Sequence, residues 1–230
     1  MTTNLIIGSG PAAAGAALAL AEDPRQQITV VDVGHQLELP NQAAVKRLAS
    51  AEPSHWESRD LELVTHQPIA GSASGLPEKR AYGSDFPFSN RGQLDGIDVV
   101  GDVNASVVSG AYGGLSNVWG SQVMVFTPET FDDWPISFSD MEPHYREILD
   151  HIPYAAEDDA LAARFPLVAR ADRLPDLAPR TTDVLRRSAR HHARLSGAGI
   201  LVGRARLAFR APDCIRCGMC MTGCPHSLIY

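Results

Sequence analysis

The residues that decide the fold are Asn4-Leu5-Ile6-Ile7-Gly8-Ser9-Gly10-Pro11-Ala12-Ala13. A short apolar run suited to a buried parallel strand leads into a glycine-rich turn, and the Ala- and Leu-rich residues that follow predict a helix to about Glu22. A second strand is then predicted at Gln27-Ile28-Thr29-Val30-Val31-Asp32. These elements form a βαβ unit whose turn has the pattern G-x-G-x-x-A, the alanine variant of the dinucleotide fingerprint.

Each residue of this pattern has a physical role. Gly8 permits the tight turn, Gly10 lets backbone N–H groups approach a pyrophosphate, and Ala13 keeps the helix close to the sheet. Pro11 suits the first helical turn, because its missing N–H costs little there. Asp32, at the end of the second strand, is placed to accept hydrogen bonds from a ribose hydroxyl. The pattern therefore predicts a dinucleotide whose diphosphate faces the helix N-terminus.

Composition excludes several classes of protein. The chain has 230 residues, of which 44% are hydrophobic, and it contains no run of 18 apolar residues that would span a bilayer. The N-terminus lacks the basic segment and cleavage site of a secretory signal, so we expect a cytoplasmic protein. A net charge of −7 argues against nucleic acid as the main partner. A phosphate-loop NTPase is disfavoured, because Ala16-Ala17 stands where that loop needs lysine and serine or threonine.

Past the βαβ unit the patterns are weaker. Residues 35–100 contain scattered Pro, Gly and Ser, and we expect them to be irregular, with an exposed loop or hinge at Gly71-Ser72-Ala73-Ser74-Gly75. The spacing Ser139-x-x-Glu142 predicts a capping box that starts an amphipathic helix. A basic helix is predicted at residues 182–192, and alternating apolar residues predict a strand at residues 200–209.

A second glycine-rich segment runs from Gly110 to Gly120. Its paired glycines, with Ser, Asn and Trp beside them, are typical of a backbone that passes close to a flat ligand. A glycine-rich turn around a core tryptophan explains the same residues equally well.

Three motifs together resemble the N-terminal part of a glucose–methanol–choline (GMC) oxidoreductase, a flavoenzyme that oxidises alcohols or sugars. In the family's order they are Gly8–Ala13 with Asp32, then Gly113-Gly114-Leu115-Ser116-Asn117-Val118-Trp119-Gly120, then Asp133-Trp134-Pro135-Ile136-Ser137. The resemblance implies an α/β, Rossmann-like FAD-binding fold with long insertions. We expect an FAD-binding region at residues 1–130, a helical region with part of the substrate domain at 131–212, and a cysteine-rich segment at 213–230.

The resemblance also implies how FAD is held. The adenosine diphosphate half would lie against Gly8, Gly10, Pro11, Ala13 and Asp32. The isoalloxazine ring would lie against the second motif, with Gly113, Gly114, Ser116, Asn117, Trp119 and Gly120 as its cofactor-binding residues. Val118 occupies the place where some relatives carry a histidine bonded to the flavin, so we expect non-covalent FAD. The family's catalytic histidine and its His/Asn partner lie near the end of a much longer chain, so we assign no catalytic residue and expect the fold to be incomplete here.

All four cysteines of the chain lie in one short segment with the pattern C-x₂-C-x₂-C-x₃-C-P, the spacing of a bacterial ferredoxin-type iron–sulfur run. Thiolates are soft ligands that favour iron–sulfur or zinc. Zinc and metal-free thiols are the alternatives, although structural zinc sites usually separate two ligand pairs by a longer loop. Either all four thiols bind one cluster, or three do and the last has another role. The predicted ligands are Cys214, Cys217, Cys220 and Cys224.

Some GMC dehydrogenases similar to this chain carry an iron–sulfur cluster at the corresponding place that takes electrons from FAD, whereas others keep the cysteines with no established cluster.

Charge is divided unevenly along the sequence: residues 164–216 hold 12 Arg and 4 acidic residues, and residues 1–163 hold 8 basic and 23 acidic residues. The Arg excess suits an acidic electron-acceptor protein as a partner. A solvated face, or pairing with the acidic remainder of the molecule, is the alternative.

The function expected from these features is an FAD-dependent oxidoreductase acting on the CH–OH group of an alcohol or sugar, with hydride passing to the flavin and electrons leaving through a cluster or directly to an acceptor. Two other readings stay open. The chain could be a non-catalytic cofactor-binding or electron-transfer subunit or fragment that another chain completes, or an NAD-binding dehydrogenase domain.

Overall fold

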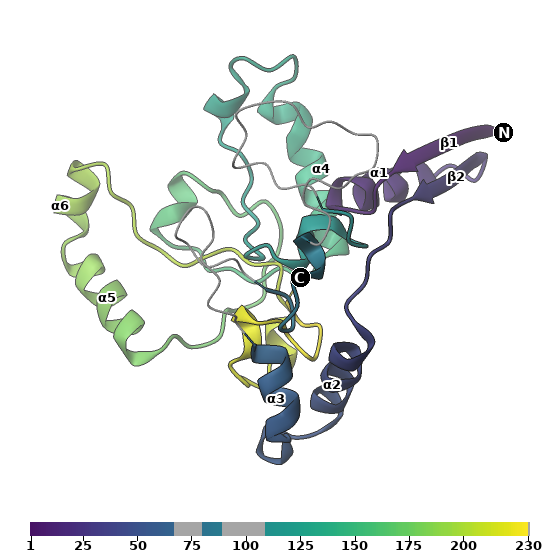
Figure 1. Cartoon of the computed structure of the whole chain (residues 1–230). Coiled ribbons are helices and arrows are strands. Elements are labelled where there is room, and N and C mark those ends of the chain that lie inside the picture. Colours follow the sequence, from purple (N-terminus) through teal and green to yellow (C-terminus); the bar gives the residue numbers. More distant parts are fainter. Residues whose placement is uncertain (67–79, 89–108, 230) are drawn as a thin grey trace, which may run out of the picture. The chain divides into compact units, whose positions relative to one another are not determined.

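The computed structural model describes residues 1–66, 80–88 and 109–229 (Figure 1). The chain divides into two compact units, Met1–Gly120 with Arg216–Ser227 and Ser121–Ile215 with Leu228–Tyr230. The described residues are mixed α/β, and the predicted loop at Gly71–Gly75 lies outside them. Their strands and α-helices are β1 (Thr2–Ile7), α1 (Pro11–Ala21), β2 (Gln26–Val31), α2 (Leu39–Ser50), α3 (Ser58–Thr65), α4 (Phe138–His151), α5 (Pro179–Arg190) and α6 (His192–Gly197).

The first unit begins with the βαβ arrangement that the sequence predicts. β1 and β2 pair in parallel, with Thr2 opposite Gln26 and Ile7 opposite Val31, and α1 connects them. The element ends agree with the predicted ones to within two residues. The N–H group of Gly8 donates to the Val31 carbonyl at 2.7 Å, which ties the glycine-rich turn to the end of β2.

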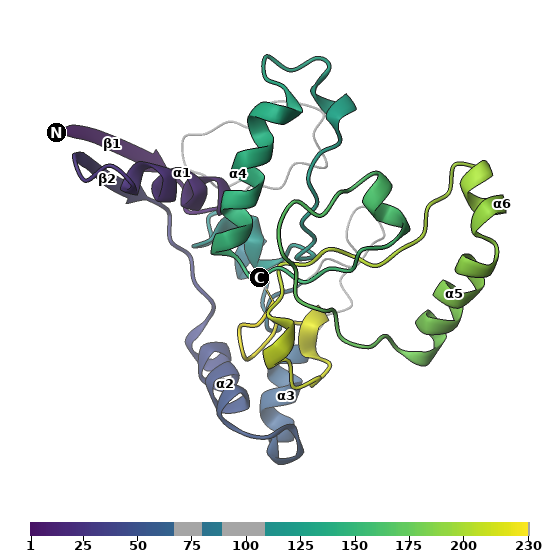
Figure 2. The same ribbon diagram turned by 180° about the vertical axis from the view of Figure 1, so that it is seen from behind.

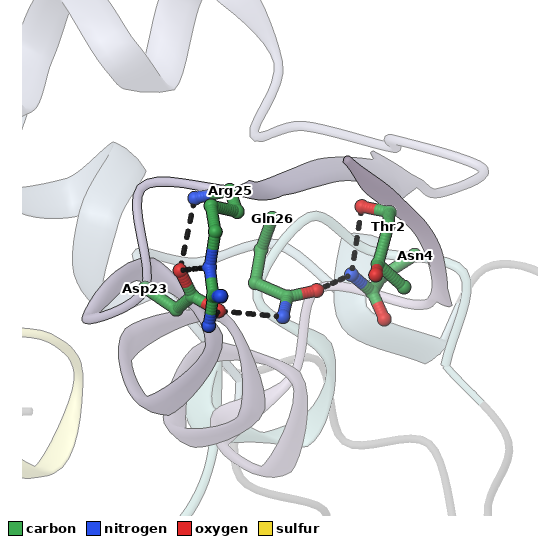
Figure 3. Close-up of polar contacts among 5 residues, drawn as sticks. All are labelled: Thr2, Asn4, Asp23, Arg25 and Gln26. Carbon is green, nitrogen blue, oxygen red and sulfur yellow. Dashed lines mark hydrogen bonds and ion pairs between the residues drawn. The ribbon is translucent and has the colours of Figure 1, made fainter.

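At the other end of the two strands, a chain of polar contacts fixes the turn between α1 and β2 (Figure 3). The Arg25 guanidinium donates two hydrogen bonds to Asp23, from Nε to Oδ1 and from Nη2 to Oδ2, each at 2.9 Å. The Gln26 side chain donates to Asp23 Oδ2 at 3.1 Å and accepts from Asn4 Nδ2 at 2.8 Å. The contacts thus link the turn before β2 to the first residues of β1.

The βαβ unit buries little of its apolar surface within the described structure. Ile7 is 82% exposed, Leu5 is 62% exposed, and Val30 and Val31 are each exposed by more than 40%. Although α1 is almost entirely Ala and Leu, none of its residues is buried in the described part of the chain. The core of the first unit therefore lies elsewhere.

Two helices, α2 and α3, supply one cluster of that core, and their presence corrects the expectation that residues 35–100 are irregular. Asn41, Ala44 and Leu48 are the buried residues of α2, and they follow one another at helical spacing. Ala44, Leu48 and Val64 form a cluster with Met219 from the cysteine-rich segment. Figure 1 shows this segment, in yellow, beside α3, and Figure 2 shows the same neighbours from behind.

The second unit contains α4, α5 and α6. A capping box starts α4 as expected, but its residues are Ser137 and Asp140 rather than Ser139 and Glu142. Ser137 is the N-cap residue, because Asp140, three residues later, donates its backbone N–H to the Ser137 hydroxyl and accepts the Ser137 N–H through its carboxylate. The predicted basic helix is confirmed as α5.

The predicted strand at residues 200–209 is wrong. Only Leu207 and Phe209 make β-bridges there, and these bridges are isolated. Leu207 pairs with Gln122 and Ala155, and Phe209 pairs with Ile229. Because each partner is a single residue of an irregular segment, no ladder extends from it.

Among the described residues there is no helix with the length and apolar character needed to cross a membrane.

Candidate functional site

Three segments of the first unit meet at the side chain of Ser9. Its hydroxyl donates a hydrogen bond to Asp32 Oδ2 at 2.8 Å and accepts one from the Gly113 N–H at 2.8 Å. Ser9 belongs to the turn between β1 and α1, Asp32 follows β2, and Gly113 belongs to the second glycine-rich segment. We call this arrangement the Ser9 junction. It unites the first two motifs, which are about a hundred residues apart in the sequence.

The backbones of the two glycine-rich segments approach each other closely at this junction. A Cβ atom added to Gly114 would lie 3.6 Å from the Cα of Gly10, and one added to Gly10 would lie 4.0 Å from the Gly113 carbonyl oxygen. Gly8 has a φ of +95°, which L side chains rarely adopt, so its predicted role in the tight turn is confirmed. The small residues therefore leave room beside the start of α1.

The start of α1 has the geometry that favours an anion. Gly10 is the N-cap residue and no side chain caps the helix, while Pro11 stands in its first turn as predicted. The N–H groups of a first helical turn have no intrahelical acceptor, and the helix dipole is positive at this end. A diphosphate is a ligand that such an end can bind through backbone N–H groups.

Asp32 is held as an exposed carboxylate. Its Oδ1 accepts the Gly34 N–H at 2.7 Å, while Oδ2 accepts the Ser9 hydroxyl. The hydrogen bond from Ser9 is the main cause that lowers the pKa of Asp32 below its ordinary value, and the Gly34 N–H adds to it. Each carboxylate oxygen has a second lone pair, so the ionised group can also accept a ligand hydroxyl.

The second glycine-rich segment is anchored just beyond β2. The His35 N–H donates to the Gly110 carbonyl at 3.0 Å, and the Tyr112 N–H donates to the His35 carbonyl at 2.8 Å. The pairing places the loop along the continuation of β2, next to Asp32.

Within this loop, the polar side chains hold the loop itself. Ser116 Oγ donates to the Gly113 carbonyl at 2.7 Å, and Asn117 Nδ2 donates to the carbonyls of Tyr112 and Gly114 at 2.9 and 2.8 Å. Trp119 is partly buried, and Gly120 is exposed. The structure therefore brings Gly113 and Gly114 to the junction, while Ser116 and Asn117 fix the shape of the loop.

Ser9 is the residue that the sequence pattern misses at this site. It occupies an unspecified position of G-x-G-x-x-A, so nothing in the pattern requires a hydroxyl there. The third motif, Asp133–Ser137, belongs to the second unit, where Trp134 packs edge-on against Phe131 with ring centroids 5.3 Å apart.

The four cysteines differ in exposure, and no disulfide joins them within the described chain. Cys224 is buried, Cys214 and Cys217 are partly buried, and Cys220 is exposed. The division between the two units falls at Arg216, so Cys214 is described with the second unit and the other three with the first. Among the described residues, no three Cys, His, Asp or Glu side chains are grouped to hold a metal ion.

The backbone of the cysteine-rich segment nevertheless has a property that suits a compact cluster. Each of the three spacers between consecutive cysteines contains one residue with positive φ, namely Arg216, Gly218 and Gly223, at +57°, +80° and +129°. Such residues reverse the chain sharply. The donor chemistry and the turns are therefore compatible with a site for soft metal ions, such as an iron–sulfur cluster or zinc.

Tyr82 is the second residue that sequence reasoning misses. Its hydroxyl donates to the Cys224 carbonyl at 2.9 Å, although 142 residues separate the two. Burial raises the pKa of Tyr82 to about 12, and the Cys224 thiol adds to the shift, so the hydroxyl stays protonated and keeps its role as a donor.

No protein-family model and no curated protein matches the chain.

Proposed function

We propose that the chain binds FAD in a Rossmann-like fold and forms part of an FAD-dependent oxidoreductase of the GMC type. The proposal is supported chiefly by the Ser9 junction, which joins the dinucleotide fingerprint, the acid after β2 and the second glycine-rich motif through two hydrogen bonds of 2.8 Å. The resemblance of three ordered motifs supports the same family. The substrate proposed is an alcohol or sugar oxidised at a CH–OH group.

Each segment at the junction would bind a different part of FAD. The first turn of α1, next to Gly8, Gly10 and Ala13, would hold the diphosphate with its N–H groups. Asp32 would accept hydrogen bonds from the adenosine ribose, because Ser9 and Gly34 keep it ionised. The segment Gly113–Gly120 would lie against the isoalloxazine ring, and its own hydrogen bonds would hold it in place.

When bound, FAD supplies the hydride acceptor for the oxidation of the CH–OH group. The residues of this chain orient the cofactor, and we assign none of them a catalytic role. The four cysteines would hold an iron–sulfur cluster that accepts the electrons. The Arg-rich helix α5, whose residues are all partly or fully exposed, would face an acidic electron-acceptor protein.

Titration of the anaerobically purified chain with FAD, followed by flavin fluorescence, tests the cofactor assignment. Asp32→Ala should raise the Kd for FAD by about 10- to 100-fold, since hydrogen bonds to an ionised group contribute about 1.5–3 kcal/mol. Asp150→Ala, an exposed carboxylate on α4, is the matched control and should leave the Kd unchanged. An unchanged Kd in Asp32→Ala would remove Asp32 from the site.

Iron and visible absorbance test the cluster. Cys217→Ser should abolish iron binding, but Cys217 packs against the core of the first unit, so the exposed Cys220→Ser is needed beside it. Full iron retention in both variants would remove these residues from the ligand set. A colourless, metal-free chain that still folds would rule out both cofactors.

Two results would favour the other functions. NAD binding without any flavin would indicate a nicotinamide-dependent domain. Tight FAD binding with no reduction of the flavin by any alcohol or sugar would indicate a cofactor-binding or electron-transfer subunit.

A further inference from the structure

A strained turn, residues 81–84, lies against the cysteine-rich segment. Ala81 and Ser84 exchange two backbone hydrogen bonds at 3.1 and 3.0 Å, and both are buried. The two residues between them, Tyr82 and Gly83, have φ values of +53° and +77°. Positive φ at both central positions is the pattern of a type I′ turn, which favours Asn-Gly. A bulky residue such as tyrosine is unfavourable at the first of these positions.

Backbone strain of this kind persists only where the surroundings impose it. Three hydrogen bonds hold Tyr82: its N–H donates to the Thr222 carbonyl at 2.7 Å, its hydroxyl donates to the Cys224 carbonyl at 2.9 Å, and its carbonyl accepts Asn41 Nδ2 at 2.8 Å. Its ring covers Gly223, where an added Cβ would come within 2.5 Å of Cε1. Tyr82 therefore contacts three consecutive residues that end in the last cysteine.

The turn is fixed in place by α2 and α3. Asn41 comes from the first turn of α2, and Gly83 lies so close to the Leu63 carbonyl of α3 that a Cβ there would overlap it. Arg47 of α2 and Asp60 of α3 are joined by two hydrogen bonds of 2.7 and 2.6 Å, and Asp60 is 2% exposed. The two helices thus form a rigid support behind Tyr82.

We propose that Tyr82 is a positioning residue that clamps the Thr222–Cys224 backbone against α2 and α3, and so sets the place of Cys224 as a ligand before any metal group is bound. The clamp makes the thiols unequal: Cys224 is held buried beneath it, whereas Cys220, four residues earlier, is exposed. The role of Cys224 as a ligand rests on the proposed cluster, whereas the clamp by Tyr82 does not.

The test measures the alkylation rate of each thiol in the metal-free, reduced full chain, with fragment-ion mass spectrometry to locate the label on each cysteine. A buried thiol reacts only when its surroundings open, so its rate follows the local opening equilibrium. Cys220 should react fast and Cys224 slowly in the unmodified chain. Tyr82→Phe, which keeps the ring and loses the donor, should speed Cys224 by about 3- to 10-fold, the size expected for one net hydrogen bond. Cys220 should not change and serves as the internal reference.

Three further variants separate the clamp from general loosening. Asn41→Ala removes the other anchor of Tyr82 and should speed Cys224 in the same direction. In the double variant, the alkylation rate of Cys224 should rise by less than the product of the two single increases, because both substitutions act through one turn. Tyr112→Phe, at a 65% exposed tyrosine, is the control and should change no rate.

With iron bound, a merely structural role would leave the cluster unaltered in a folded variant. The clamp instead predicts a changed electron paramagnetic resonance spectrum of the reduced cluster in Tyr82→Phe, and faster iron loss, at a thermal midpoint close to that of the unmodified chain. If the unmodified chain binds no iron, the proposed cluster is wrong while the thiol rates still decide the clamp. A folded Tyr82→Phe chain with an unchanged Cys224 rate would overturn the clamp.

Discussion

The guanidinium of Arg206 lies 3.5 Å from the carboxylate of Asp159, with the Arg206 side chain only 1% exposed. Arg206 also donates to the carbonyls of Phe165 and Arg204, each at 3.1 Å. Asp159 in turn accepts the N–H groups of Leu161 and Arg204, at 3.0 and 2.6 Å. One buried cation therefore joins several irregular segments of the second unit, a part of the chain that has no sheet ladder in its described residues.

Removal of this cation should destabilise the second unit. Arg206→Ala should lower the free energy of unfolding by about 3 kcal/mol, because it leaves the partly buried Asp159 without its cation and opens a cavity. In a Trp56→Phe/Trp119→Phe background, Trp134 of this unit is the remaining tryptophan, so the shift of its fluorescence in urea follows the transition. Arg173 forms an exposed ion pair with Asp176, and its side chain is 85% exposed. Arg173→Ala should therefore change the free energy of unfolding by no more than about 0.5 kcal/mol. Equal effects of the two variants would contradict the role given to Arg206.

The Ser9 junction predicts a loss of cofactor affinity from a residue outside the fingerprint positions. Ser9→Ala removes the hydrogen bonds to Asp32 and to the Gly113 N–H, so the two glycine-rich segments lose their link. The Kd for FAD should rise about 10-fold, the equivalent of about 1.4 kcal/mol. Ser50→Ala, an exposed serine at the end of α2, is the control. An unchanged Kd would mean that the junction does not contribute to binding.

The polar contacts at the start of β2 predict a pH effect. The hydrogen bond from Arg25 is the largest cause that lowers the pKa of Asp23 from 3.8 to about 2. A lowered carboxyl pKa stabilises the fold above the unfolded value, so this contribution is complete above about pH 4. It is lost as the pH falls toward 2.

Carboxyl chemical shifts of Asp23 in an acid NMR titration check the assignment. Arg25→Gln should bring the pKa of Asp23 back toward 3.8, since the charged donor is lost. The pKa of Asp140, which is lowered by hydrogen bonds from Ser137, should stay unaltered in that variant. A pKa of Asp23 near 3.8 in the unmodified chain would show that the contacts in Figure 3 do not persist in solution.

Substitution of two glycines should have opposite effects. Gly83→Ala should cost about 3 kcal/mol or more, because its φ is +77° and the new methyl group would overlap the Leu63 carbonyl. Gly15→Ala, in α1 with no neighbouring atom within 4 Å of the added Cβ, should stabilise the chain by up to about 1 kcal/mol. Urea unfolding followed by far-UV circular dichroism measures both. A tolerated Gly83→Ala would show that the turn and α3 are not in close contact.

The sequence predicts the parts of the fold that depend on local patterns. The spacing of Gly8, Gly10 and Ala13 places β1, α1 and β2 correctly, because a strand–turn–helix with this backbone has few alternatives. The helix α2 is missed, although Pro40 stands in its first turn and Asn41, Ala44 and Leu48 have helical spacing. Scattered Pro, Gly and Ser across residues 35–100 obscure this short signal.

Contacts between distant segments are not predictable in this way. The bond from Tyr82 to Cys224 depends on a turn, two helices and a segment near the end of the described chain, and no periodicity marks it. The alternation at residues 200–209 is met only by isolated bridges, and it does not mark the buried side chains, because Arg206 is 1% exposed whereas Ile200 is 49% exposed. The observed capping box starts two residues before the predicted one, because Ser137 and Ser139 each precede an acid by three positions.

The exposed apolar surface of β1, β2 and α1 has a consequence for local unfolding. Segments with little buried apolar contact open at low free-energy cost, whereas α2, α3 and the turn at Tyr82 share a buried core and charged hydrogen bonds. In hydrogen–deuterium exchange on the chain alone, the strand amides should therefore exchange well before those of α2. If the chain binds FAD as proposed, the exchange of the strands should slow further as the free FAD concentration rises above its Kd. The segment with the clearest sequence pattern is thus expected to be the first to open locally in the chain without a ligand.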